Sequence, residues 1–241
     1  MVRYRYRKIM KLAVSVTTVS MTGSVNDWRS QVGELKALGI VETAVFPTAL
    51  KESERYELYR TLVEAGIVSI PLLHLITEMK PEEIGFLADH FEIGCFNLHS
   101  TRKWPLHYDY SEWASKIFLE NGKEVPDEEE LGVFAGLCID FSHWHNERLV
   151  GNELYCEQMN ENVKRFPIGV SHVSVIKKER LCNPFRPEIE QYDSHLMQDV
   201  AELDYLGRYV EYLAPINAIE LENPISDQLR AWEYIESMMR H

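Results

Sequence analysis

Short apolar runs rich in β-forming residues recur along this chain, and each is followed by a side chain that can bind a metal ion. The runs include IVSIPLL before His74, CFNL before His99, KIFL before Glu120, GLCI before Asp140 and IGVS before His172. Such runs are typical of strands buried on both faces of a parallel sheet. The chain must therefore fold with these strands covered on both sides.

The segments between the runs have the apolar period of amphipathic helices. The predicted helices cover residues 27–38, 52–65, 81–91, 153–166 and 199–213. Together with KLAVSVT near the start, VETAVFP after the first helix and NAIELE near the end, the pattern predicts eight strands that alternate with helices. This order predicts an α/β fold, a (β/α)8 TIM barrel, whose usual size of about 250 residues is close to this chain of 241.

A single domain is expected, since no linker or low-complexity stretch divides the sequence. We place the barrel at residues 10–241, because MKLAVSV resembles the start of a first strand. Residues 1–9 form an N-terminal extension that alternates basic and aromatic residues and to which we assign no function.

In a TIM barrel the C-terminal ends of the strands converge on one face, which carries the active site. The candidate metal ligands are His74, His99, Glu120, Asp140, His143, His172, Asp193, His195 and Glu222. Two carboxylates about 4 Å apart repel each other by roughly 4 kcal/mol at an effective dielectric constant near 20, and divalent cations remove that cost. The interleaved imidazoles favour zinc, manganese or iron over magnesium or calcium. Any one of these residues is explained as well by an ordinary polar strand end, but the set predicts a metal centre.

Local spacing supports some of these ligands. Asp140 ends a strand and His143 follows three residues later, so one turn can direct both to the same face. His145 is a competing candidate, which we rank as substrate-facing or structural. Asp193 and His195 alternate about one residue, which in an extended loop sends both to the same side.

For two of the candidate ligands the sequence allows a second interpretation. Glu120 could end a helix that includes SEWASKIFLENG, but the β-preferring Ile117 and Phe118 favour a strand. Glu220 and Glu222 lie two apart and face the same side of the last strand; we expect Glu222, nearer the strand end, to be the ligand.

The net charge of -13 argues against a general nucleic-acid binder. Basic residues nevertheless gather in two of the predicted loops on the catalytic face. They are either solvated loop charges or the binding site of a phosphate-bearing substrate. These residues are Arg102 and Lys103 beside Trp104, and Lys177, Lys178, Arg180 and Arg186.

Composition also limits the cellular setting. No apolar run approaches the roughly 20 residues needed to span a bilayer, and no signal-peptide cleavage site follows the N-terminus, so we expect a cytoplasmic protein. The four cysteines have no CxxC spacing, and buried reduced thiols are expected rather than disulfides or zinc ligands.

The residues at the strand ends resemble the xylose isomerase-like TIM barrels, which include the endonuclease IV family (AP endonuclease family 2) and many sugar isomerases and epimerases. The matching segments are FLEN, CIDFSH, VSHVS, DSH and LENP. The resemblance to endonuclease IV implies up to three zinc ions. His74, His99 and Glu120 would hold one; Glu120, Asp140, His172 and Glu222 the second; and His143, Asp193 and His195 the third. Such a centre would hydrolyse a phosphate ester with metal-activated water.

The sequence departs from endonuclease IV in ways that disfavour DNA as the substrate. Most segments between ligands are shorter, and LITEMKPEE follows His74 where a DNA-intercalating loop is expected. The sugar isomerases and epimerases imply one divalent ion, zinc or manganese, held by Glu120, Asp140, His172 and Glu222, with Glu120 and Glu222 moving the proton. A third hypothesis is a barrel that binds a small ligand without catalysis. A small phosphorylated or sugar substrate is the expected partner.

Overall fold

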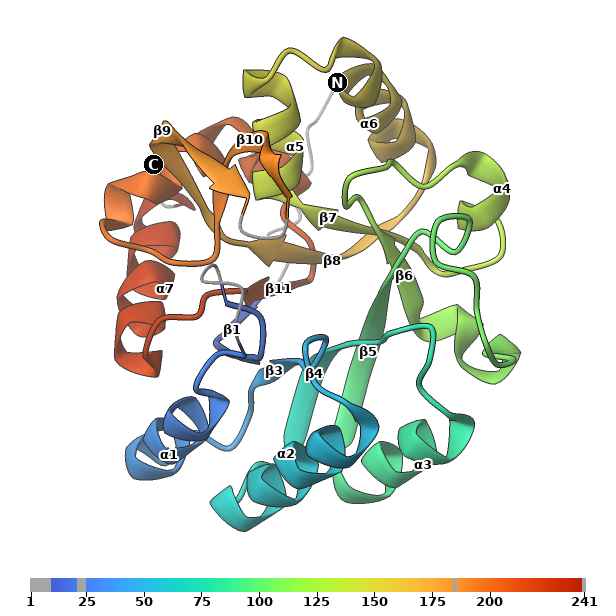
Figure 1. Ribbon diagram of the computed structural model, residues 1–241, viewed down its shortest axis with the longest axis vertical. Coiled ribbons are helices and arrows are strands. Elements are labelled where there is room, and N and C mark those ends of the chain that lie inside the picture. The colour runs from blue at the N-terminus through green and yellow to red at the C-terminus, as the bar shows by residue number, and fades with distance from the viewer. Residues whose placement is uncertain (1–9, 21–24, 184–185, 240–241) are drawn as a thin grey trace, which may run out of the picture.

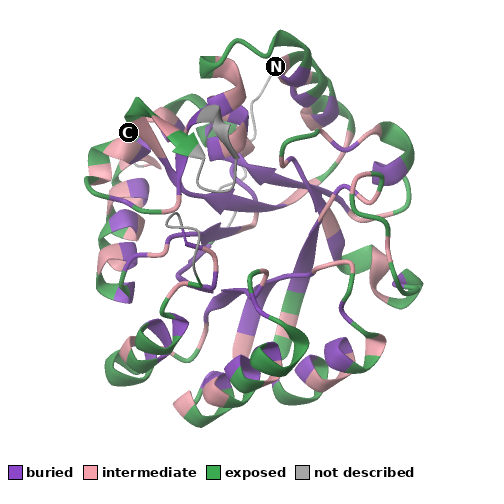
Figure 2. Cartoon of the chain, in the orientation of Figure 1, coloured by how far each residue is buried: buried purple, intermediate pink, exposed green. Residues whose placement is uncertain are grey.

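The computed structural model describes residues 10–20, 25–183 and 186–239, with the side chains of 183–190 left aside. Residues 1–9, the predicted extension, lie outside this description. Figure 1 shows the strands at the centre of the molecule with helices around them. Buried residues in Figure 2 concentrate on the strands and on the helix faces turned toward them. This is the predicted (β/α)8 arrangement.

Nine parallel strands form the central sheet, in the order β1-β11-β8-β7-β6-β5-β4-β3-β2. β1 and β2 are parts of one stretch, broken at Val14, and β1 pairs with β11 while β2 pairs with β3. The same stretch therefore lies at both edges of the sheet and joins them into a nearly closed barrel. The nine strands are β1 Lys11–Ala13, β2 Ser15–Thr17, β3 Ala44–Phe46, β4 Ser69–His74, β5 Glu92–His99, β6 Ile117–Glu120, β7 Gly136–Asp140, β8 Ile168–Val173 and β11 Ile216–Ile219.

The predicted helices form close to their predicted bounds. Glycine ends two of them: Gly39 and Gly66 adopt the left-handed conformation with φ of 67° and 87°. The helices are α1 Trp28–Leu38, α2 Glu52–Ala65, α3 Pro81–His90, α4 Glu128–Leu131, α5 Phe141–Leu149, α6 Glu153–Arg165 and α7 Ile225–Met239, with the 3₁₀ segment η1 Ser111–Lys116.

The segment predicted as a helix over 199–213 instead forms two 3₁₀ segments, η2 Val200–Arg208 and η3 Val210–Tyr212. Its buried side chains explain the difference. Leu203, Leu206 and Tyr209 are buried at a spacing of three residues, which matches the three residues per turn of a 3₁₀ helix.

A hairpin that the sequence did not predict follows β8. Its antiparallel strands β9 Val175–Asn183 and β10 Arg186–Ser194 pack against η2 and α5. Lys177, Lys178, Arg180 and Arg186, which were expected in a loop, therefore lie on this hairpin. Within the described residues, no helix is long and apolar enough to cross a membrane.

The interior of the barrel is filled by side chains that alternate with those facing the helices. The inward cluster is apolar at mid-height and is composed of Ala13, Ala44, Phe46, Leu72, Cys95, Cys138, Val170 and Ala218. Polar inward residues follow one step nearer the C-terminal ends of the strands. These polar side chains thus lie directly above a packed apolar layer, and contact with this layer restricts their conformations.

Candidate metal centre

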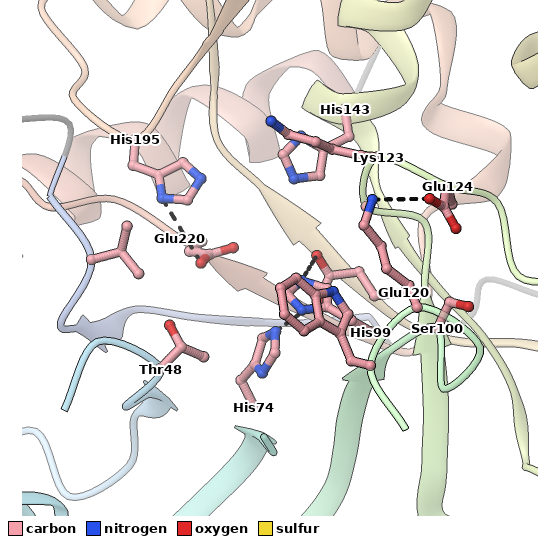
Figure 3. A pocket seen from close by; sticks show the side chains of 14 residues that line it. Thr48, His74, His99, Ser100, Glu120, Lys123, Glu124, His143, His195 and Glu220 are labelled. Carbon is pink, nitrogen blue, oxygen red and sulfur yellow. Dashed lines mark hydrogen bonds and ion pairs between the residues drawn. The ribbon is translucent and has the colours of Figure 1, made fainter. Parts of the chain in front are cut away.

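The predicted ligands of strands four to eight meet at the C-terminal end of the barrel. His74, His99, Glu120 and Asp140 each end a strand, and His172 is the residue before the end of β8. Figure 3 shows His74, His99 and Glu120 close together, with Glu220, His143 and His195 around the same space. The β6 strand confirms the strand interpretation of Glu120.

Glu120 lies at the centre of this group. Its Oε2 is 3.2 Å from His74 Nε2 and 3.6 Å from His172 Nδ1, and its Oε1 is 3.5 Å from His99 Nε2. Asn97 Nδ2 donates a hydrogen bond of 2.6 Å to Oε2. Burial alone would raise the pKa of Glu120, but His172, His99 and His74 hold it well below its usual range. The buried carboxylate is therefore ionised. One of its oxygens could bind a metal ion beside His74 and His99, and the same group could bind another ion beside His172.

Asp140 presents one oxygen without a partner. Its Oδ1 accepts hydrogen bonds from Ser142 Oγ at 2.6 Å and from the His143 backbone N–H at 3.0 Å, which caps α5. Its Oδ2 is buried and has no hydrogen-bond partner, and neither ring nitrogen of His172 makes a hydrogen bond. Buried polar atoms are normally satisfied by hydrogen bonds, and a cation bound between Asp140 and His172 would satisfy these atoms.

An irregularity in β8 sets which residues face each other. The register between β7 and β8 shifts after Leu137, and beyond the shift Asp140 lies opposite His172. Gly169 occupies the shifted position, where a Cβ atom would lie 2.1 Å from the ring of Phe118. A larger residue there would require the Phe118 ring to move, so the glycine lets this ring pack against the shifted strand.

His143 of α5, Asp193 of β10 and His195, just after β10, lie beside this cluster. His143 Nδ1 lies 3.0 Å from Asp193 Oδ2, and His143 Nε2 lies 3.7 Å from Asp140 Oδ2. Burial lowers the pKa of His143, but the Asp140 and Asp193 carboxylates raise it to about 10. His195 Nδ1 is 3.9 Å from Glu220 Oε1. Asp193 thus orients His143, and His195 lies nearer to Glu220.

Glu220 reaches the cluster. Glu220 continues the inward alternation of β11, is buried, and places Oε2 3.2 Å from His172 Nδ1. The chain leaves the strand after Ile219 and bends at Glu222 and Asn223. Glu222 is half-buried and accepts a hydrogen bond of 2.7 Å from Ser20. Its role as a ligand therefore stays a prediction, whereas Glu220 contacts His172 directly.

Several combinations of these side chains bring ligand atoms within 4.8 Å of one another. The combinations, taken over the described residues, are His74–His99–Glu120, Glu120–Cys138–His172, Glu120–Asp140–His143 and Asp140–His172–Glu220. The trio His143, Asp193 and His195 expected for a third ion is not among them. The residues present therefore fit a divalent metal, with Glu120 shared between neighbouring positions.

A cavity of about 470 Å³ opens above the cluster. Lys103, Trp104 and Lys123 line it, and Lys103 Nζ is 3.0 Å from Glu124 Oε1. These side chains make one wall of the cavity. The ligands that line it are His74, His99, Glu120, His143, His195 and Glu220.

The other predicted substrate residues have partners elsewhere or lie outside the cavity. Arg102 forms ion pairs with Asp127 and Glu129, and Lys177 pairs with Glu202 at 2.8 Å. Lys178 is exposed on the hairpin. The side chain of Arg186 lies outside the described residues, and Arg180 donates a hydrogen bond to the Tyr192 hydroxyl.

His145 is structural in this arrangement. Its Nδ1 lies 3.2 Å from the hydroxyl of Tyr209, and its ring packs against Tyr205. Of the cysteines, all of which have free thiols, Cys95 and Cys138 are buried as expected, whereas Cys156 is half-buried and Cys182 is exposed.

The sequence analysis did not identify Asn97, Ser142, Lys123 or Glu220 as site residues. A signal was present for Asn97, because it lies two residues before His99 on the same strand and so faces the same side. Ser142 and Lys123 lie in turns after strands, where the sequence gives no direction for a side chain.

No protein-family model and no curated protein matches this chain. Among solved structures, it is similar to a xylose isomerase-like TIM barrel protein from Mycobacterium smegmatis in complex with magnesium. That similarity has 14% sequence identity and a TM-score of 0.50, and it covers 95% of this chain and 96% of that chain. At this identity the likeness supports the fold alone.

Two further structures have lower TM-scores. The probable 3-DHS dehydratase AsbF from Bacillus anthracis, involved in petrobactin synthesis, has 11% identity and a TM-score of 0.49, with 96% of this chain and 100% of that chain covered. A xylose isomerase domain containing protein from Salmonella typhimurium has 13% identity and a TM-score of 0.41, with 96% and 94% covered.

Proposed function

We propose that this chain is a metal-dependent enzyme that hydrolyses a phosphate ester of a small molecule, with two divalent ions that share Glu120. The sharing of Glu120 is the observation that carries the proposal. His74 and His99 approach this carboxylate from one side and His172 from another. A site for one ion would have no need of the first two histidines.

The two positions differ in depth. The outer set, His74, His99 and Glu120, lines the cavity, whereas Asp140 and His172 are completely buried and do not. Glu120 and Glu220 line the cavity and also lie beside the buried ligands, so they can contact either position. The outer set would hold the ion that faces the substrate, and Asp140, His172 and Glu220 would hold the inner ion. Zinc fits this mixture of imidazole and carboxylate ligands, and manganese is the alternative.

Divalent ions held by these residues would supply a water of lowered pKa at the outer position and positive charge to offset the charge that develops on phosphoryl oxygens. The chain itself orients the groups around them. Asn97 fixes Glu120, and Ser142 with the His143 N–H fixes Asp140 so that Oδ2 faces the centre. Rigid ligands of this kind keep the reacting groups in place.

Glu220 is suited to be a metal ligand. Burial raises its pKa, but His195 and His172 outweigh that effect and lower it to about 2, so Glu220 is a carboxylate at neutral pH. It also lines the cavity. In the hydrolase it would hold the inner ion, because a carboxylate of such low pKa is a weak base.

The cavity favours a small anionic substrate over DNA. Its volume of about 470 Å³ lies within the range of small-molecule pockets. Lys103 and Lys123 supply positive charge for a phosphoryl group, and Trp104 supplies an apolar face. The net charge of -13 would oppose a long polyanion.

A second candidate is isomerisation or epimerisation of a sugar or sugar phosphate with one ion. It is favoured by the compact inner set, in which Asp140, His172 and Glu220 place ligand atoms within 4.8 Å of one another. Glu120 and Glu220 would then move a proton between adjacent carbons. His74 and His99 would have no common role in this reaction.

Metal content and activity together test the two candidates. We expect purified protein reconstituted with zinc to hold about two ions per chain and to hydrolyse p-nitrophenyl phosphate or its diester. His99→Asn should release about one ion and reduce turnover by about 100-fold or more, while the exposed control His90→Asn changes neither.

One ion per chain, unchanged in His99→Asn, would contradict the two-ion hydrolase. Exchange of deuterium from solvent into a sugar phosphate would then support the isomerase. Protein that binds neither zinc nor manganese would contradict both and leave a barrel that binds ligands without catalysis.

A further inference from the structure

A thiol lies directly beneath the candidate metal centre. Cys138 is two residues before Asp140 on β7, so both side chains point into the barrel. In the register of the sheet Cys138 lies opposite Glu120 of β6. The backbone therefore places a sulfur atom next to Glu120, which belongs to three of the four candidate ligand groups.

The surroundings of Cys138 differ from those of an ordinary core cysteine. Its Sγ, a carboxylate oxygen of Glu120 and a ring nitrogen of His172 lie within 4.8 Å of one another. Cys138 and His172 are fully buried, and Glu120 is 3% exposed. Both nitrogens of His172 lack a hydrogen-bond partner. His172 Nδ1 is 3.2 Å from Glu220 Oε2 and 3.6 Å from Glu120 Oε2, so the contacts of this imidazole are carboxylates and a thiol, which are all metal-ligand types.

Cys95 provides an internal comparison. It belongs to the same inward cluster and is also buried, but its thiol donates a hydrogen bond of 3.2 Å to the Pro71 carbonyl. Within the described residues it belongs to no group of potential metal ligands. Cys95 thus fits the role of a core filler, which Cys138 does not share.

We propose that Cys138 supplies a thiolate ligand to the inner ion, together with Glu120 and His172, and that this ion is closed off from the cavity and is zinc or a similarly thiophilic metal. The inference rests on the metal centre of the proposed function. It assigns the two ions different roles: the inner one holds the barrel end together, and the outer one faces the substrate. Closed sites with thiolate ligands are typical of structural zinc.

Ligand chemistry supports this assignment. Magnesium and calcium take oxygen ligands, whereas thiolate and imidazole select zinc and other softer ions. When the ion binds, the Sγ–H bond breaks, its proton leaves to solvent, and a bond forms between Sγ and the metal without change of oxidation state. Without a cation, burial raises the pKa of Cys138 to about 12, so the thiol stays protonated in the metal-free protein.

Cobalt(II) reports a thiolate ligand directly, since sulfur bound to cobalt absorbs strongly in the near ultraviolet while any bound cobalt absorbs in the visible. The half-buried Cys156 and exposed Cys182 are first replaced by serine so that they cannot bind cobalt. In this background we expect both absorptions. Cys138→Ser should lose the near-ultraviolet band and keep the visible one, and the matched control Cys95→Ser should keep both.

X-ray absorption of the zinc-loaded wild-type protein avoids any effect of substitution on folding. We expect a sulfur neighbour at about 2.3 Å from zinc. Bound metal without a sulfur neighbour, or a near-ultraviolet band that survives Cys138→Ser, would overturn this inference and leave the proposed function intact. Failure of the protein to bind cobalt or zinc at all would overturn both.

Discussion

At the scale of single residues, a buried ion pair joins two helices away from the candidate metal centre. Arg55 of α2 and Glu83 of α3 meet through two contacts of 2.7 Å, and their side chains are 4% and 1% exposed. The Tyr59 hydroxyl donates to Glu83, and Arg55 also donates to the Leu50 carbonyl. Every charge in this pair is compensated, so the loss of one partner leaves the other buried without compensation.

We therefore expect Glu83→Ala to lower the free energy of unfolding by about 3–5 kcal/mol. The exposed neighbour Glu82 gives a matched control, and Glu82→Ala should change it by less than about 0.5 kcal/mol. Urea unfolding followed by circular dichroism measures both. Equal unfolding midpoints for the two variants would show that the pair adds nothing to stability.

A second residue-scale feature is the neutral histidine in α5. Burial, followed by the charges of Arg148 and Arg208, lowers the pKa of His145 to about 4. An unfolded histidine has a pKa near 6.5, so between these values the unfolded chain binds a proton that the folded chain does not. The stabilising effect is complete above about pH 6.5 and is lost as the pH falls toward 4.

Replacement of His145 by glutamine should consequently flatten the pH dependence of stability. We expect the wild-type protein to lose more unfolding free energy than His145→Gln between pH 7.5 and pH 5, measured on metal-free protein. His90→Gln, at an exposed histidine, serves as the control and should follow the wild type. If His145→Gln showed the same slope as the wild type, the histidine would be protonated in the folded protein.

At the scale of elements, two buried glutamines stabilise the seam of the barrel, which is the region where β1 and β2 pair with β11 and β3. Gln228 of α7 accepts a hydrogen bond from the Ser15 N–H and donates to the Ser15 and Leu221 carbonyls. Gln31 of α1 accepts from the Thr17 N–H and donates to the Leu221 and Asn223 carbonyls. These bonds satisfy backbone groups at the break between β1 and β2, and just after β11.

Gln228→Leu should therefore be strongly destabilising although leucine is apolar and similar in size. Ser15 and Leu221 would keep buried backbone groups without partners, at a cost of about 1–3 kcal/mol each. Thermal unfolding should show a loss of several degrees, while Gln158→Leu on the exposed side of α6 should leave the midpoint nearly unchanged. A neutral Gln228→Leu would mean that water replaces the glutamine at the seam.

At the scale of the whole molecule, segments spread over residues 117–220 bring their acidic side chains to one end of the barrel. Glu120, Asp140, Asp193 and Glu220 come from β6, β7, β10 and the end of β11, and all are buried. Imidazoles offset part of their charge in the metal-free protein. A bound divalent ion offsets it more completely and joins several strands, so metal binding should stabilise the entire barrel.

Removal of metal by a chelator should accordingly lower the melting temperature. At a free zinc concentration 1,000 times the dissociation constant the stabilisation is about 4 kcal/mol, or roughly 8–16 °C for a chain of this size. Glu120→Gln should abolish most of this shift, whereas the exposed control Glu157→Gln should keep it. Calorimetry with and without zinc measures this shift in melting temperature. An unchanged shift in Glu120→Gln would show that Glu120 is not a metal ligand.

Much of the fold could be predicted because its signals are local. Apolar runs for β4 to β8 and amphipathic periods for α1, α2, α3 and α6 appear in the sequence within one or two residues of their bounds. The sequence does not predict the β9–β10 hairpin because its strands carry many charged residues and no long apolar run. The 3₁₀ character of η2 was missed because the spacing of three at Leu203, Leu206 and Tyr209 was taken as a helical period.

The sequence by itself determined that ligand-type side chains would gather at one end of a barrel, because strand ends are encoded by local pattern and parallel strands bring those ends together. Only the tertiary structure decided which atoms face one another. Glu220 contacts His172, the β8 register pairs His172 with Asp140, and the inward alternation of β7 puts Cys138 beneath Glu120. These choices depend on register and chain direction between segments far apart in sequence, which no local pattern encodes.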